Sequence, residues 1–259
     1  MKSSALQKIR WIFIWGITLF LCIPLSAQDY HAFIAKGDKY YQKFDNKKAL
    51  VEYQKAYDAA SESYEALMKV TRAYNDVGED LDSDESEAYF KKAVEYAELL
   101  QKKFPDSAEA YFYLAATYGN LALFKGGKEK VRLSRNVEKN AQKSIELDSE
   151  FAHPYVVLGI YYREVANLNW FLKTFAKTIF GGLPDGTNED SEKMLLKAIE
   201  LNPSIYAHYE LAKTYEVMGK VDKSVEHLKK VVELPIVDHQ DLMKRADAEK
   251  KLSKLRKKQ

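Results

Sequence analysis

Cysteine is almost absent from this sequence, since Cys22 is the one cysteine among 259 residues. It lies in an apolar N-terminal stretch, and removal of that stretch would leave a chain without thiols. Such a chain forms no disulfide, has no thiol nucleophile and offers no thiolate to a metal. We therefore expect a fold held together by packing, and a function without cysteine chemistry.

Residues that break helices are also scarce, with 6 prolines and 11 glycines in the whole chain. Apolar residues make up 46% of the sequence and charged residues 30%. This balance provides enough apolar surface for a core and favours helix over strand.

The chain also lacks a strong charge of either sign, because its formal net charge is +2. Lys2, Lys8 and Arg10 lie in the N-terminal leader, and without them 37 basic residues face 38 acidic ones, a formal charge of −1. A near-neutral protein has no electrostatic reason to bind nucleic acid. We therefore expect no nucleic-acid partner.

The first 27 residues have the layout of a secretory signal peptide. A basic start precedes an apolar run, residues 11–25, and Leu25-Ser26-Ala27 precedes the polar Gln28. The run is shorter than the roughly 20 residues that span a bilayer as a helix. The sequence thus predicts cleavage after Ala27 and an exported, periplasmic or secreted protein. An uncleaved anchor formed by residues 11–25 is the alternative.

Patterns of catalytic or ligand-binding residues are missing as well. No two of the five histidines have the spacing of a metal-binding pair on one helix, and no Gly-x-Ser-x-Gly motif is present. Gly126-Gly127 lies among lysines, but it lacks the Gly-Lys-Ser/Thr ending of a phosphate-binding loop. We predict a protein that is not an enzyme and holds no metal or cofactor.

What the sequence does contain is a repeated helical pattern. Tyr155-x-x-Leu158-Gly159-x-x-Tyr162 returns in the segment from His208 to Tyr215, with the spacing of the first helix of a tetratricopeptide repeat. The pattern predicts an all-α protein, an α-solenoid of about five tetratricopeptide-type helical hairpins with a C-terminal capping helix. We expect the repeat domain at 28–259, with repeats at about 30–61, 63–105, 107–149, 151–203 and 204–235 and the cap helix at 238–256.

Three of these repeats contain extra residues. In the first repeat Gly37 and Ala49 are 12 residues apart, but the matching positions are 22 apart in the second and third repeats and 32 apart in the fourth. The insert at 164–186 has aromatic residues at mostly helical spacing. It has three interpretations: it fills the groove or extends the core, it docks a partner, or it touches a membrane through Trp170 and Phe171. The membrane interpretation is the least favoured.

The C-terminal half resembles a known family. Val165-Ala-Asn-Leu-Asn-Trp170, the segment Phe180-Gly-Gly-Leu-Pro184 and Leu196-Lys-Ala-Ile-Glu-Leu-Asn-Pro203 are similar to the regulator of microtubule dynamics family, over roughly residues 107–250. The resemblance implies an all-α, non-catalytic protein that acts by binding partners. A cleaved leader would keep the chain away from cytoplasmic microtubules, so we transfer the fold and not the named role.

The first helix of each hairpin is expected to line a concave groove. Side chains opposite the Leu-small-Tyr packing row would face this groove, where a peptide or a partner helix would bind; Val156, Ile160 and Phe112 could equally be core residues. With Trp170 of the insert added, the predicted partner-binding residues are Met68, Arg72, Asn75, Phe112, Asn120, His153, Val156, Ile160, Arg163, Tyr206, Tyr209, Lys213, Glu216 and Trp170.

Together these observations predict a non-catalytic protein-interaction scaffold of the cell envelope, exported across a bacterial-type inner membrane. A second hypothesis is a membrane-anchored or cytoplasmic tethering protein like the regulators of microtubule dynamics. A third is a domain that binds lipid or a small molecule through the aromatic insert 164–186.

Overall fold

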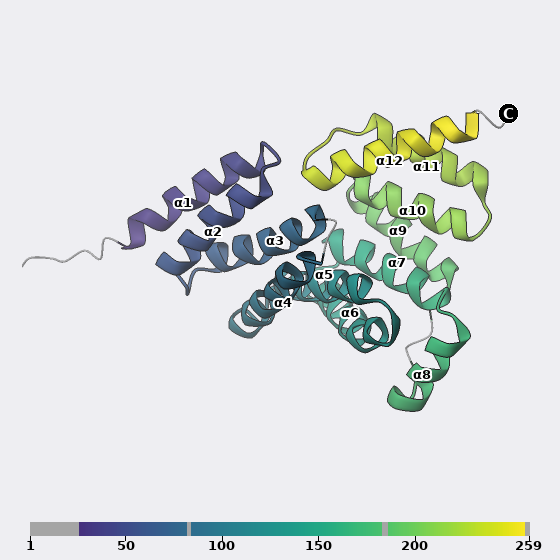
Figure 1. Cartoon of the computed structure of the whole chain (residues 1–259), viewed down its shortest axis with the longest axis horizontal. Helices are drawn as coiled ribbons and strands as arrows, with labels where there is room; N and C mark the ends of the chain where they lie inside the picture. Colours follow the sequence, from purple (N-terminus) through teal and green to yellow (C-terminus); the bar gives the residue numbers. More distant parts are fainter. Residues whose placement is uncertain (1–25, 82–83, 183–185, 257–259) are drawn as a thin grey trace, which may run out of the picture.

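The computed structural model describes residues 26–81, 84–182 and 186–256, and within these ranges the chain forms twelve α-helices and no strand (Figure 1). The helices are α1 (Ser26–Tyr41), α2 (Asn46–Ala59), α3 (Tyr64–Asp80), α4 (Ser86–Lys103), α5 (Ala108–Lys125), α6 (Gly127–Leu147), α7 (His153–Ala166), α8 (Trp170–Phe180), α9 (Asn188–Leu201), α10 (Ile205–Val217), α11 (Val221–Glu233) and α12 (His239–Arg256).

The helices stack as consecutive antiparallel hairpins. The pairs are α1 with α2, α3 with α4, α5 with α6, α7 with α9 and α10 with α11, and the second helix of each pair contacts the first helix of the next. The hairpins follow an arc, and α12 packs against α10 and α11 at its end (Figure 1). The predicted α-solenoid with a capping helix is confirmed.

Small residues bring the two helices of a hairpin close together. A Cβ atom added at Gly37 would lie 2.5 Å from the ring of Tyr53, and one added at Gly159 would lie 2.5 Å from Leu195. Tyr53 and Leu195 are fully buried. These two hairpins therefore need glycine in their first helix, because a large side chain of the second helix fills the space that a Cβ would take.

Serine side chains fix where three of the first helices begin. The hydroxyls of Ser63, Ser107 and Ser204 accept hydrogen bonds from the backbone N–H groups three residues later, at the starts of α3, α5 and α10. This capping satisfies a donor that has no partner inside the helix. It sets the direction in which each first helix leaves the preceding turn.

The extra residues of the second and third repeats lengthen both helices of the hairpin. Helix α3 continues to Asp80, and its Gly78 packs on Phe90 of α4 at a distance that leaves no room for a Cβ. In the next hairpin Gly126 and Gly127, both at positive φ, make the turn between α5 and α6. In both hairpins the two helices extend and pack along the added length.

The insert of the fourth repeat forms a helix of its own, α8. Asn169 caps its start by accepting from the N–H of Leu172, and the left-handed Gly181 ends it. Helix α8 packs on α6 through the buried Ala176 and stands apart from the stacked hairpins (Figure 1). It does not fold back into the groove, so the interpretation in which the insert fills the groove is wrong.

Candidate functional site: an acidic cavity on the concave side

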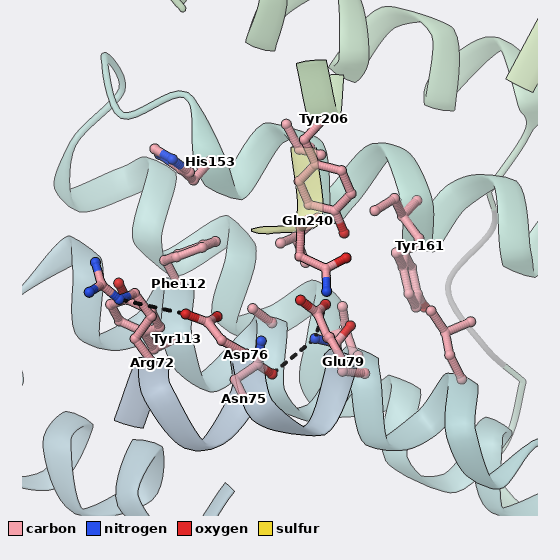
Figure 2. Close-up of a pocket in the computed structure, with 18 of the residues that line it drawn as sticks. Arg72, Asn75, Asp76, Glu79, Phe112, Tyr113, His153, Tyr161, Tyr206 and Gln240 are labelled. Carbon is pink, nitrogen blue, oxygen red and sulfur yellow. Dashed lines mark hydrogen bonds and ion pairs between the residues drawn. The ribbon is translucent and has the colours of Figure 1, made fainter. Parts of the chain in front are cut away.

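A cavity of about 390 Å³ lies on the concave side of the arc. Helices α3, α5, α7 and α10 form its walls together with part of α6, and the segment between α11 and α12 with the start of α12 forms its remaining side. Figure 2 shows Gln240 and Tyr206 reaching toward Glu79 from across this space. The first helices of four hairpins thus surround one site instead of lining an open groove.

The cavity is closed where the last helix meets α3. His239 Nδ1 lies 2.5 Å from Oδ1 of Asp80, and the amide of Gln240 donates to the same oxygen at 3.4 Å. The other oxygen of Asp80 accepts a hydrogen bond from Asn46 at 2.9 Å. Asp80 therefore joins the beginning of α2, the end of α3 and the beginning of α12.

Polar groups of α3 form the N-terminal wall. The guanidinium of Arg72 stacks on the ring of Tyr41, 4.0 Å from its centroid, and its Nε lies 3.7 Å from the carboxylate of Asp76. Further along α3, Asn75 and Glu79 both accept hydrogen bonds from the amide of Asn120 on α5, at 2.9 Å and 2.7 Å. Figure 2 shows Asn75, Asp76 and Glu79 of this wall directed into the cavity.

Carboxylates outnumber cations in this lining. Burial, reinforced by Glu79 and Asp238, raises the pKa of Asp76 well above its usual value in spite of Arg72. Burial likewise raises the pKa of Glu79, and burial with the neighbouring Asp238 raises the pKa of Asp241. Six carboxylates and two permanent cations are found among the described residues of the wall: Asp76, Glu79, Glu109, Glu164, Asp238 and Asp241 against Arg72 and Lys130.

Lys130 adds little free positive charge to the wall, because its Nζ lies 2.5 Å from the carboxylate of Glu164. His153 adds none near neutral pH, since burial lowers its pKa. With Lys130 paired to Glu164 and Arg72 facing Asp76, the lining keeps an excess of carboxyl groups at Glu79, Glu109, Asp238 and Asp241, which Lys244 offsets only in part from outside the lining. A cationic group that entered the cavity would favour the charged forms of these carboxyls.

Aromatic and aliphatic side chains form the opposite wall. Phe112 packs edge-on against Phe151, with ring centroids 5.4 Å apart, and its ring lies at the same distance from His153. Val156 and Ile160 of α7 continue this apolar surface. Apolar walls with a few converging polar groups are typical of binding sites.

Eight of the side chains expected at the groove come together in the cavity. They lie on α3, α5, α7 and α10, and the first and last of them are more than a hundred residues apart in the sequence. These residues are Arg72, Asn75, Phe112, Asn120, His153, Val156, Ile160 and Tyr206.

Two of the expected residues on α10, Tyr209 and Glu216, face the chain's own last helix, whereas Lys213 contacts residues of α10 itself. The hydroxyl of Tyr209 donates to Asp247 at 2.8 Å, and Glu216 pairs with Lys251 at 3.0 Å. Lys213 lies over the ring of Tyr209. Helix α12 therefore occupies the place in which the sequence analysis expected a partner protein.

The remaining expected residues lie elsewhere. Arg163 is buried, and its guanidinium bonds the carboxylate of Glu210 at 2.5 Å and the backbone carbonyl of the same residue at 2.9 Å. Met68 packs against the N-terminal core. Trp170 stands on α8, outside the cavity.

Several lining residues were not expected from the sequence. Asp76 and Glu79 follow Arg72 at positions four and seven along α3, so they share its helix face. Helical spacing alone could have identified them. Val237, Asp238 and Gln240 reach the cavity only because α12 folds over it, and no local pattern encodes that contact.

The carboxylates of the wall do not converge on one point. Among the residues that the structure describes, no three His, Cys, Asp or Glu side chains are placed so that they could hold a metal ion. The negative charge is spread over a larger volume, which suits an organic cation better than a single metal ion.

Comparison with known proteins places this fold in a family. A model of the family "Regulator of microtubule dynamics protein 1-3" matches residues 33–256. The chain belongs to this family. The resemblance that the sequence showed over roughly 107–250 therefore includes the first two hairpins as well.

Curated relatives share part of this chain. Regulator of microtubule dynamics protein 3 of Mus musculus is 29% identical over 133 residues, which are 51% of this chain and 28% of the mouse protein. Regulator of microtubule dynamics protein 1 of Mus musculus is 29% identical over 94 residues, or 36% of this chain and 31% of that protein. The matched part is thus less than a third of either relative.

Among solved structures, the fold is similar to that of a thermophilic TPR protein of Thermus thermophilus. The TM-score is 0.62 and the sequence identity 18%, and the match covers 85% of this chain and 97% of the other. At this identity the likeness concerns the fold alone, and it supports the tetratricopeptide-type solenoid.

Family membership corrects the expected location. The predicted export to the periplasm or the medium is wrong, because the matching relatives are animal proteins named as regulators of microtubule dynamics, and microtubules are polymers of the cytoplasm. None of the described helices is both long enough and apolar enough to cross a membrane. Residues 11–25, the basis of the leader and anchor interpretations, lie outside the described residues.

Proposed function

We propose that this protein is a non-catalytic interaction module, and that its concave cavity binds a short segment of a partner protein. The observation that supports this most is the meeting of four first helices around one apolar and acidic site. The tetratricopeptide-type fold and the family membership agree with a binding role.

The size of the cavity favours an extended segment over a partner helix. One turn of an α-helix is about 10 Å across and about 5.4 Å long, which corresponds to a volume of roughly 400 Å³. The cavity of about 390 Å³ is enclosed by several helices, and it is therefore small for a partner helix, which presents a face over several turns. A few residues of extended chain, or a chain end with one large side chain, fit this volume better.

The charge of the cavity favours a segment that carries lysine or arginine. Asp76 and Glu79 are half-buried carboxylates whose pKa values are raised by burial. A cation beside these two carboxyl groups would stabilise their charged forms, which burial disfavours. The neighbouring aromatic wall would contact the apolar part of the lysine or arginine side chain.

The test is binding of basic, neutral and acidic peptides to the protein and to the variant Asp76→Asn with Glu79→Gln. We expect the protein to select basic peptides and the variant to lose at least tenfold in affinity, about 1.4 kcal/mol. The control variant Glu200→Gln with Glu146→Gln removes two exposed carboxylates from other helices. Its affinity should equal that of the unmodified chain, and selection of acidic peptides would contradict the proposal.

A second candidate is a direct effect on microtubules, and the name of the family is the observation that favours it. Co-sedimentation of the protein with assembled microtubules would test it. If the cavity carries this role, Asp76→Asn with Glu79→Gln should lower the bound fraction. Equal sedimentation with and without microtubules would leave peptide binding as the function.

A further inference from the structure

Helix α8 presents a group of exposed apolar side chains on the outside of the molecule. Trp170 is 77% exposed, Phe171 50% and Ile179 57%. Phe171, Phe175 and Ile179 are spaced by four residues and form one row along the helix, beside Trp170. A surface of this kind on a short protruding helix has no role in the packing of the solenoid.

Cations lie at both faces of α8 that carry exposed aromatic side chains. On one side, Lys128 of α6 places its Nζ 5.4 Å from the ring centroid of Phe171 and 5.1 Å from that of Phe175. On the opposite face of α8, Lys173 and Lys177 form a second row next to Trp170. Arg135 of α6 lies over the ring of Phe180, 4.8 Å from its centroid.

The charges near α8 differ from the other charges of the same region. Several basic residues at the end of α5 and along α6 have carboxylate partners: Lys125 pairs with Glu87, Lys130 with Glu164 and Arg132 with Glu129, although Lys139 of α6 has none among the described residues. In the described part of the chain, the four cations that face or belong to α8 have no such partner: Lys128, Arg135, Lys173 and Lys177. Helix α8 itself contains no acidic residue.

We propose that α8, together with Lys128 and Arg135 of α6, docks the protein on an anionic lipid surface. Tryptophan and phenylalanine enter the boundary between headgroups and acyl chains, and lysines at the rim pair with lipid phosphates. The exposed tryptophan and isoleucine favour a lipid surface over an acidic protein surface, which would not need them. This surface lies outside the concave cavity, so the docking does not depend on the proposed peptide binding.

The fluorescence of Trp170 provides a direct test in the full chain. Trp11 and Trp15 would be replaced by phenylalanine, so that Trp170 is the single tryptophan. We expect its emission to move to shorter wavelength with vesicles that contain roughly 30% phosphatidylserine, and to change little with phosphatidylcholine alone. This readout separates α8 from any association through residues 11–25. Unchanged emission with the anionic vesicles would refute the docking.

Variants then separate the apolar and the cationic contributions. Phe171→Ser with Ile179→Ser should lower binding to anionic vesicles at least tenfold. Lys173→Gln with Lys177→Gln should lower it about fivefold for each lysine and abolish the preference for anionic lipid.

Matched controls exist elsewhere on the surface. Val217→Ser with Val221→Ser removes two exposed apolar side chains, and Lys229→Gln with Lys250→Gln removes two exposed charges. Both should bind vesicles as the unmodified protein does, and equal loss in the controls would overturn the assignment to α8. A photo-crosslinking residue at position 171 that labels protein instead of lipid would show a protein partner and also overturn it.

Discussion

The extra residues in this chain are used in two different ways. In the second and third repeats they lengthen the hairpins, and the added turns pack on one another and bring Glu79 and Asn120 to the cavity. In the fourth repeat they form α8, which contacts α6 and leaves most of its side chains exposed. An insertion inside the stack changes the core and the concave site together, whereas an insertion beside the stack adds a surface and leaves the core unchanged.

The largest expected difference between the two kinds of insertion concerns stability. Phe90 is buried between Gly78 and Phe124 in the lengthened hairpins. Phe90→Ala should lower the free energy of unfolding by about 4 kcal/mol, because it leaves a cavity in a packed core. Urea unfolding followed by circular dichroism measures this, and a loss below about 1 kcal/mol would show that the added turns do not pack as described.

A second difference concerns the dependence of stability on pH, which arises from two histidines in the stacked hairpin α10–α11. The Nδ1 atoms of His208 and His227 lie 2.8 Å apart, and burial, His227 and Lys230 lower the pKa of His208 to about 4. Between pH 6.5 and pH 4 the unfolded chain therefore binds more protons at this position than the folded chain. Stability should fall as the pH falls through that window, by up to about 3 kcal/mol.

The pH dependence is measured as urea unfolding at a series of pH values. His208→Gln should flatten the curve between pH 6.5 and pH 4. His31→Gln, at an exposed position, is the matched control and should keep the slope of the unmodified chain. Helix α8 contains neither imidazole nor carboxylate, so changes in α8 should leave this slope as it is.

The smallest effect is expected in α8. Trp170→Ala removes a large side chain that is mostly exposed, and it should change the free energy of unfolding by less than about 0.5 kcal/mol. The same urea titration as for Phe90→Ala provides the comparison. A loss of several kcal/mol would mean that α8 belongs to the core, and the contrast between the two kinds of insertion would disappear.

Much of the fold could be predicted from short spacings in the sequence. Gly37 and Gly159 mark close approaches within a hairpin, and the residue types at Arg72 and Asn75 together with helical periodicity place them on the concave face. These inferences concern contacts between neighbouring helices, which local patterns encode.

The closure of the cavity could not be predicted in this way. It depends on the curvature accumulated over the whole stack, which decides whether His239 reaches Asp80. For the same reason Tyr209 and Glu216 were expected in an open groove, although α12 covers them. The prediction of export was wrong for another reason. It rested on the N-terminal leader, and the family resemblance received less weight.

The contact of His239 with Asp80 joins residues that are 159 positions apart. A repeat array is held by nearest neighbours, so it can form from any point and fray from either end. The contact between α3 and α12 adds an interaction between hairpins that are not neighbours in the array. Closing so long a loop costs conformational entropy, so we expect this contact to form late in folding. The His239–Asp80 contact should also be among the first to break. The local opening that starts unfolding would then also open the cavity to a ligand.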